Sequence, residues 1–263
     1  MQQRHKDRKL YFTELANTSR EFYIDYVKSI APVKPGTKVL EIGCGEGGNL
    51  LPFAEIGCEV TGIDIDTRRI ELAREYFAES NQAGSFIASD FLAVPIPETE
   101  EQRYDIVLVH DVIEHIEPPH KVSFLELMMK YMRQDAVAFL AFPAWQMPFG
   151  GHQQICVSKI SKVPFIHLLP TKLYKALLTR CKEPEGTVEE LLSIKRSKMP
   201  IERFEKIIKQ AGLKVLTKRL WLINPHYKQK FGLSPVKEVC PFDKIPWLRN
   251  FYSTSAWYML KKG

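Results

Sequence analysis

Five ionisable side chains in this sequence are of the types that move protons or bind cations. His110, Asp111, Glu114 and His115 stand close together, and His152 follows in a Gly-Gly-His-Gln-Gln stretch. If a helical turn begins at Asp111, then Asp111, Glu114 and His115 fall at positions i, i+3 and i+4 on one face. A neutral imidazole titrates near working pH, which suits a general base. Two carboxylates and two imidazoles would also make a mixed oxygen and nitrogen site for a divalent ion.

A glycine-rich segment lies upstream of this cluster. Residues 39–50 read Val-Leu-Glu-Ile-Gly-Cys-Gly-Glu-Gly-Gly-Asn-Leu, which predicts a short apolar strand, a turn and a helix. Gly43 permits a tight turn with positive φ, and Gly45 and Gly47 leave backbone against which a ligand can lie. Glu41, on the strand side, could fix the loop or meet a cation, and Cys44 is expected to fill space.

Two further strands are predicted to end in acids. Residues 59–66 are an apolar run that finishes in Asp64, about twenty residues past the glycines. A carboxylate at that place in a nucleotide-binding α/β fold accepts both ribose hydroxyls. Residues 85–91 form a second such run, which ends in Asp90 and the aromatic Phe91.

The ordered set Glu41-x-Gly-x-Gly-x-Gly47, Asp64, Asp90 and the strand of His110 resembles the class I S-adenosylmethionine (SAM)-dependent methyltransferases. The resemblance covers roughly residues 36–142, with a helix and two strands near the C-terminus. A dinucleotide dehydrogenase would show Gly-x-Gly-x-x-Gly, a spacing that Gly48 also satisfies. The Asp90-Phe91 pair and the Asp-Val-Ile-Glu-His stretch favour the methyltransferase.

This resemblance implies SAM as the cofactor. The backbone around Gly43, Gly45 and Gly47 would face its methionine portion and ribose, Asp64 would take the ribose hydroxyls, and Asp90 with Phe91 would face the adenine. A helix cap or a surface carboxylate is the plain alternative for each acid. The complete cofactor-binding set that we expect is Glu41, Gly43, Cys44, Gly45, Gly47, Asp64, Ile65, Asp90, Phe91 and His110.

The Glu114-His115 pair further resembles the ubiquinone-biosynthesis O-methyltransferases. In some of these, and in small-RNA 3′-terminal 2′-O-methyltransferases, the motif ligates a divalent metal. A metal here would use Asp111, Glu114, His115 and His152, but Asp111 is shorter than the glutamate of those families, so a metal is not favoured. The catalytic candidates are His110, Asp111, His115 and His152, and a buried structural role is the alternative for His115.

The alternation of apolar strands and amphipathic helices predicts an α/β fold with right-handed crossovers. With the resemblance, we expect a Rossmann-like, doubly wound, mostly parallel sheet of seven strands with an antiparallel last strand and an inserted cap. The expected division is a helical segment over 1–35, a SAM-binding core over 36–142, an irregular cap over 143–199, and the rest of the core over 200–263 with a second insertion at 224–252. The expected helices cover 18–30, 49–56, 67–80, 124–132 and 201–210, and the later strands cover 136–142, 213–223 and 254–260.

The charges are distributed unevenly along the chain. Residues 1–194 contain 21 Lys or Arg and 27 Asp or Glu, whereas residues 195–263 contain 16 and 4. The basic C-terminal region suggests an anionic binding partner, such as a phosphorylated substrate, nucleic acid or a membrane surface. A solvated lysine-rich face has the same composition and is the alternative. The insertion at 224–252 interleaves aromatic residues with cations, and residues 160–178 are apolar with scattered lysines, so RNA contact and peripheral membrane contact are kept as alternatives.

No apolar run approaches the ~20 residues of a membrane span, the N-terminus is not that of a secretion signal, and the five cysteines form no Cys-x-x-Cys. These features predict a cytoplasmic protein. The function that we expect is transfer of a methyl group from SAM to a small or lipid-linked acceptor at oxygen. An RNA methyltransferase and a non-enzymatic SAM-binding module are the alternatives.

Overall fold

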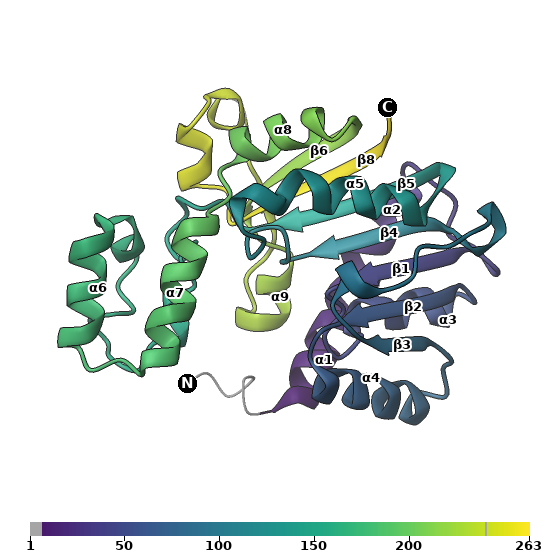
Figure 1. Cartoon of the computed structure of the whole chain (residues 1–263), viewed down its shortest axis with the longest axis horizontal. Coiled ribbons are helices and arrows are strands. Elements are labelled where there is room, and N and C mark those ends of the chain that lie inside the picture. Colours follow the sequence, from purple (N-terminus) through teal and green to yellow (C-terminus); the bar gives the residue numbers. More distant parts are fainter. Residues whose placement is uncertain (1–6, 240) are drawn as a thin grey trace.

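A computed structural model describes residues 7–239 and 241–263. Within these residues, eight strands form one sheet in the order β3-β2-β1-β4-β5-β8-β6-β7 (Figure 1). The parallel strands are β1 (Lys38–Ile42), β2 (Glu59–Asp64), β3 (Ser85–Ala88), β4 (Tyr104–His110) and β5 (Met132–Phe142). Strand β8 (Ser255–Lys262) runs antiparallel to β5 and to β6 (Leu213–Ile223).

This topology confirms the expected mostly parallel α/β fold with an antiparallel last strand. The one addition is β7 (Val236–Lys237), which pairs with the edge strand β6 at Trp221 and Ile223. Two residues are too few to show the alternation of polar and apolar residues that marks a strand in sequence. The predicted sheet of seven strands is therefore extended by a short eighth one.

Helices cover both faces of the sheet. Apolar side chains of α1 (Arg8–Thr18), η2 (Ser19–Tyr23), α2 (Ile24–Lys28), α3 (Leu51–Glu55) and α4 (Thr67–Glu79) form one core with Val39 of β1. Those of α5 (Lys121–Tyr131) and α8 (Ile201–Gln210) form a second core with Leu40 and Ile42. Successive side chains of a strand point to opposite faces, so burial on both sides explains the continuous apolar runs of β1 and β5.

The N-terminal helical region begins earlier than the predicted helix over 18–30. Asp7 caps α1, because its side chain accepts a hydrogen bond from the Leu10 N–H at 2.9 Å. The helical backbone then passes through a π-helical turn, η2, into α2. Polar residues interrupt the apolar period in α1, which hides this helix from a search for amphipathic spacing. Residues 1–6 of the predicted N-terminal segment lie outside the described residues, as does Cys240.

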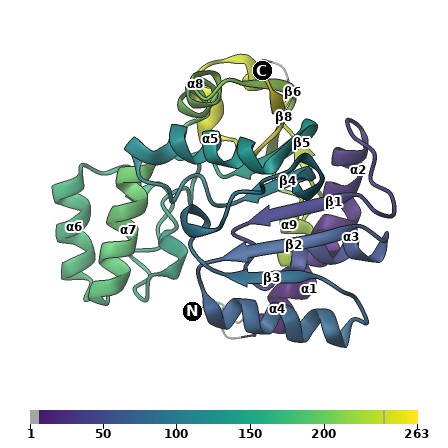
Figure 2. The ribbon, with the colours of Figure 1, turned by 45° about the vertical axis from the view of Figure 1, so that its right-hand side comes forward.

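The cap over 143–199 is more helical than predicted. It contains α6 (Thr171–Arg180) and α7 (Glu185–Ser197), which stand together beside the sheet in both views (Figures 1 and 2). Their shared core contains Cys156, Tyr174, Leu178, Val188 and Leu191. Pro170 and Pro184, which suggested irregular chain, are the residues that precede the two helices. Proline is tolerated at a helix start, so here it marks the boundary instead of excluding the helix.

The remaining elements are short. Within the described residues they are helix α9 (His226–Phe231) and eight 3₁₀ turns: η3 (Gly48–Leu50), η4 (Phe91–Ala93), η5 (Glu100–Gln102), η6 (Pro118–His120), η7 (Gln153–Ile155), η8 (Ile166–Leu168), η9 (Phe242–Lys244) and η10 (Leu248–Phe251). None of the helices in the described residues has the length and apolar character that crossing a membrane requires.

Candidate active site

The glycine loop follows β1 and takes three left-handed backbone conformations. Gly43, Gly45 and Gly47 have φ values of 77°, 53° and 81°, which other residues rarely adopt. A Cβ on Gly43 would lie 2.4 Å from the Val112 side chain, so this glycine lets β1 approach the segment after β4. A Cβ on Gly47 would lie 2.9 Å from Phe86, so this glycine is needed for packing against β3. Of these three glycines, Gly43 alone lines the cavity described below.

Two members of the predicted cofactor set lie beneath the loop. Glu41 is 1% exposed, and the Asn49 side-chain amide donates to its carboxyl at 2.7 Å. Burial raises the pKa of Glu41 to about 8, so this residue fixes the loop as a mostly protonated acid near neutral pH. Cys44 is also buried, against Gly62 of β2, where burial raises the pKa of its thiol. The expectation that Cys44 fills space agrees with this packing.

Asp64 joins the glycine loop to β2. One of its carboxylate oxygens accepts the Gly45 N–H at 2.8 Å, and the other accepts the Asp66 N–H at 2.9 Å. Each oxygen of an ionised carboxylate has two lone pairs, so both retain capacity for a further donor. The residue is half-buried, at the carboxyl end of its strand. It can therefore accept the two hydroxyls of a ribose while it holds the loop in place.

A cavity of about 410 Å³ opens beside Asp64, within the size range of small-molecule sites. Phe91 is buried at its wall against Phe124, and Ile65 and Leu92 are 72% and 63% exposed. Asp90 caps η4 by accepting the Leu92 N–H at 2.9 Å, and it also lines the cavity. The lining residues are Ile42, Gly43, Ile63, Asp64, Ile65, Ser89, Asp90, Phe91, Leu92, Val112, His115, Ile116, Glu117, His120, Ser123 and Phe124.

His110 does not line this cavity, because both of its ring nitrogens face protein groups. The Tyr23 hydroxyl lies 2.6 Å from Nε2, and the Asp111 carboxylate lies 3.4 Å from Nδ1. Burial raises the pKa of Tyr23, so its phenol stays protonated and shares a hydrogen bond with Nε2. Nδ1 faces Asp111. This arrangement orients His110 as a bridge between η2 and the end of β4.

Asp111 ends β4 in a strained conformation. Its φ is 53°, and its N–H donates to the Ala141 carbonyl of β5 at 2.9 Å. Non-glycine residues with positive φ are uncommon and often occur at functional sites. The predicted helical face of Asp111, Glu114 and His115 does not form, because the turn begins one residue later, with the His115 N–H donating to the Val112 carbonyl at 2.9 Å. The left-handed residue separates Asp111 from the other two.

The structure instead joins Glu114 and His115 to His152. Possible ligand atoms of these three residues lie within 4.8 Å of one another, and the two imidazole rings are 5.0 Å apart at 68°. His152 comes from the loop after β5, where its φ is 57°. The set is three of the four residues that a metal was expected to use, and Asp111 lies outside it.

Burial favours the neutral forms of Glu114 and His152, whereas His115 is exposed and partly shielded from solvent. This shielding lowers the pKa of His115, which lines the cavity with one edge still in solvent. Burial lowers the pKa of His152 to about 3, assisted by the neighbouring His115. Burial and the charge of Asp111 raise the pKa of Glu114 well above its usual value, and neither of its carboxyl oxygens makes a well-formed hydrogen bond within the described chain. His115 is thus an unprotonated imidazole in the cavity wall at neutral pH.

Sequence reasoning missed several residues of the site. Glu117 and His120 line the cavity a few residues after His115, and their polar side chains in the same segment were a signal that could have been used. Tyr23 reaches His110 from 87 positions away. Lys121 is fully buried near Glu114, its ammonium donates to the Ile113 carbonyl, and burial lowers its pKa to about 7. No local sequence pattern predicts the contact of Tyr23 with His110 or the burial of Lys121 near Glu114.

Known proteins share both the sequence of this region and the fold. Residues 39–135 match the family model described as a methyltransferase domain. The ubiquinone biosynthesis O-methyltransferase of Bordetella avium is 32% identical over 102 residues, 38% of this chain and 40% of that protein. Its counterpart in Glaesserella parasuis is 33% identical over 110 residues, 40% of this chain and 45% of that protein. The chain therefore spans no more than half the length of these curated relatives.

Solved structures extend the likeness to nearly the whole fold. The magnesium protoporphyrin IX methyltransferase of Synechocystis PCC 6803, with bound SAH, has a TM-score of 0.55 and 13% identity over 95% of this chain and 84% of its own. A plantazolicin methyltransferase in complex with SAH has a TM-score of 0.59 and 17% identity over 99% and 89%. Residues 39–135 are thus similar in sequence to a methyltransferase domain, and the chain shares the fold of these SAM-dependent methyltransferase structures.

Proposed function

We propose that this chain transfers a methyl group from SAM to an oxygen of a small or lipid-linked acceptor. The observation that carries the proposal is that His115 lies in the wall of the same cavity as Gly43 and Asp64. The neutral imidazole of His115 and the carboxylate proposed to bind ribose, Asp64, thus line the same cavity. The similarity to ubiquinone biosynthesis O-methyltransferases supports oxygen as the acceptor atom and a small molecule as its carrier.

The residues of the cavity fit the cofactor. Asp64 retains lone pairs for the ribose hydroxyls, Gly43 leaves backbone beside the methionine portion, and Phe91 lies in the wall next to Asp90. The exposed apolar side chains of Ile65 and Leu92 would be covered by a planar adenine. Exposed apolar surface at a cavity rim is typical of a ligand site.

Bound SAM supplies a sulfonium methyl, which is already an activated electrophile. The chain's part is to orient an acceptor hydroxyl and to remove its proton. His115 is the proposed base, because its lowered pKa keeps the ring unprotonated at neutral pH. His152, with a pKa of about 3, stays neutral beside it and holds its orientation. Protonated Glu114 can donate a hydrogen bond within the group.

A divalent metal is not favoured in this role. Glu114, His115 and His152 offer one carboxyl and two imidazoles, but burial favours the protonated form of Glu114, which is a poor ligand. Proton removal by His115 requires no cation.

The direct test is a methyl-transfer screen with purified protein and radiolabelled SAM. Quinols, phenols, sugars and RNA serve as acceptors, each with and without chelator. We expect label in an oxygen-linked product of a quinol or phenol, and a much lower rate for His115→Ala. A wild-type protein that binds SAM but labels none of these acceptors would contradict the proposal and favour a non-enzymatic SAM-binding module, and label in RNA alone would replace the acceptor class.

A further inference from the structure

A second cleft, of about 610 Å³, lies between the first residues of α8 and the segment around η10. It shares no lining residue with the cavity beside Asp64. Its walls carry three cations, Lys198, Arg203 and Lys206, and two exposed aromatic side chains, Trp247 and Phe251. The proposed methyl transfer makes no use of these residues.

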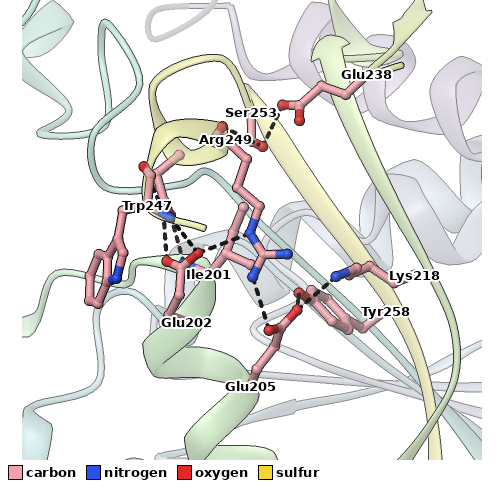
Figure 3. A network of polar contacts seen from close by, with 10 residues as sticks. Ile201, Glu202, Glu205, Lys218, Glu238, Trp247, Arg249, Ser253 and Tyr258 are labelled. Carbon is pink, nitrogen blue, oxygen red and sulfur yellow. Dashed lines mark hydrogen bonds and ion pairs between the residues drawn. The ribbon is translucent and has the colours of Figure 1, made fainter. Parts of the chain in front are cut away.

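Within the described residues, the three cations of the cleft have no ion-pair partner. Neither Lys198, Arg203 nor Lys206 forms an ion pair with an acid of the described chain, and Arg203 donates only to the Lys198 carbonyl, at 3.3 Å. The acid among the lining residues is Glu202. The Arg249 Nε and the Trp247 N–H both lie 2.9 Å from one oxygen of Glu202 (Figure 3). The Asn250 amide lies 2.7 Å from the other oxygen.

Because of these contacts, the negative charge of Glu202 does not neutralise the cations of the cleft. Burial alone would raise its pKa, but the hydrogen bonds from Trp247 and Asn250 hold that pKa below its usual value, so the carboxylate is ionised. Arg249, whose side chain is 8% exposed, compensates its charge. Of the charges that the structure describes, three positive ones in the cleft lie outside any ion pair, and together they attract an anion of more than one charge.

The aromatic wall is held in place at a cost in backbone strain. Trp247 has a φ of 65° and yet is 59% exposed. A positive φ at a bulky residue is a true outlier and persists only where its surroundings enforce it. One enforcing contact is the hydrogen bond from the Trp247 N–H to Glu202 (Figure 3). The other is the hydrogen bond from the Asn250 amide to the Trp247 carbonyl, at 3.2 Å. The Glu202 carboxylate therefore has two roles: its negative charge is paired with Arg249, and it holds the exposed Trp247 side chain at the rim of the cleft.

We propose that this cleft binds a phosphate monoester that carries a flat apolar group. The phosphate bears a charge near −2 and has acceptor oxygens for Arg203 and the two lysines. The apolar group would stack on Trp247, which is 59% exposed, and contact the exposed part of Phe251. A phosphorylated metabolite and a lipid with a phosphate monoester headgroup share this chemistry. The site is independent of the proposed methyl transfer, and its test measures binding alone.

The experiment is a calorimetric titration of the full chain with 1-naphthyl phosphate in the absence of SAM. We expect saturable binding, with 1-naphthol and inorganic phosphate each binding at least about tenfold more weakly. Arg203→Gln/Lys206→Gln should weaken binding of 1-naphthyl phosphate by about tenfold or more, and Trp247→Ala should weaken it by a similar factor. The matched control is Lys209→Gln/Lys214→Gln, which removes two exposed charges outside the cleft and should leave affinity unchanged.

Vesicles distinguish the two sources of the phosphate. The source is a lipid if the protein sediments with vesicles that contain phosphatidic acid, and if this is lost in the Arg203→Gln/Lys206→Gln variant but kept in the control variant. The source is a free metabolite if the protein binds 1-naphthyl phosphate but not the vesicles. Thermal melting of every variant shows whether the fold is intact. The proposal is overturned if 1-naphthyl phosphate does not bind at millimolar concentration, or if folded cleft and control variants lose affinity equally.

Discussion

Asp64→Ala is the change that tests the cofactor site most directly. In the structure its carboxylate accepts the N–H groups of Gly45 and Asp66, at 2.8 and 2.9 Å. The proposed complex adds two ribose hydroxyls to the same two oxygens. A hydrogen bond to a charged group contributes about 1.5–3 kcal/mol. Water replaces part of this at a half-buried carboxylate, so we take about 3 kcal/mol for the pair, which is roughly a 100-fold loss of SAM affinity.

Calorimetric titration with SAM measures this loss, and Asp66→Ala is the matched control. Asp66 lies two residues away and caps α4 by accepting the N–H groups of Arg68 and Arg69. Loss of a helix cap costs about 1 kcal/mol of stability, so Asp66→Ala should lower the melting temperature and leave SAM affinity within a few-fold. If folded Asp64→Ala binds SAM as the wild type does, the assignment of the ribose site is wrong.

Four further outcomes follow from the site. His115→Ala should lower turnover by about 10²–10⁴ while SAM affinity changes little; equal losses in both quantities would mean that His115 is structural. Because the pKa of His115 is lowered, the unprotonated base is lost only as pH falls below about 6.5, so the acid limb of turnover should lie under that pH and should be absent in His115→Ala. Burial raises the pKa of Glu41 to about 8 from 4.5, so the folded state binds an extra proton and wild-type stability should fall as pH rises between these values. Glu41→Gln, followed by thermal melting from pH 5 to 9, should flatten that fall; a slope unchanged by the variant would show that another group causes it. Chelator should leave the methyl-transfer rate within about twofold, since no step requires a cation; loss of activity that Mg²⁺ or Zn²⁺ restores would assign Glu114, His115 and His152 to a metal.

The parts of the fold that could be predicted are those in which local chemistry dictates structure. Gly43 needs its positive φ for the turn after β1, and Asp64 ends an apolar strand, so sequence alone could place both at the carboxyl ends of neighbouring strands, where they line one cavity. Helix α8 begins and ends at the predicted residues, because its apolar period is clear and a glycine stops it at Gly212. The prediction of a mostly parallel sheet followed from the alternation of such elements and is confirmed.

The parts that could not be predicted depend on contacts between distant segments. Whether His110 faces the ligand or the protein is decided by Tyr23, which no pattern near His110 reveals. The left-handed conformation of Asp111 shifts the following turn by one residue and so divides the predicted helical face. In the cap, the prolines before α6 and α7 have the same appearance in sequence as prolines that break helices. In each case a single backbone conformation or partner decides between two structures of similar local energy.

His152 shows why the acceptor side of the site depends on the cap. It enters from the loop that leads out of β5 into residues 143–199, whereas His115 belongs to the segment after β4. The two rings meet at 5.0 Å only because β4 and β5 are neighbours in the sheet, so that both loops leave the same edge. Burial by this loop contributes to the low pKa of His152, and the proximity of His115 lowers it further. His152 is thus kept neutral beside the proposed base His115, so a change in how this loop packs should alter the surroundings of His115 and shift the acid limb of turnover.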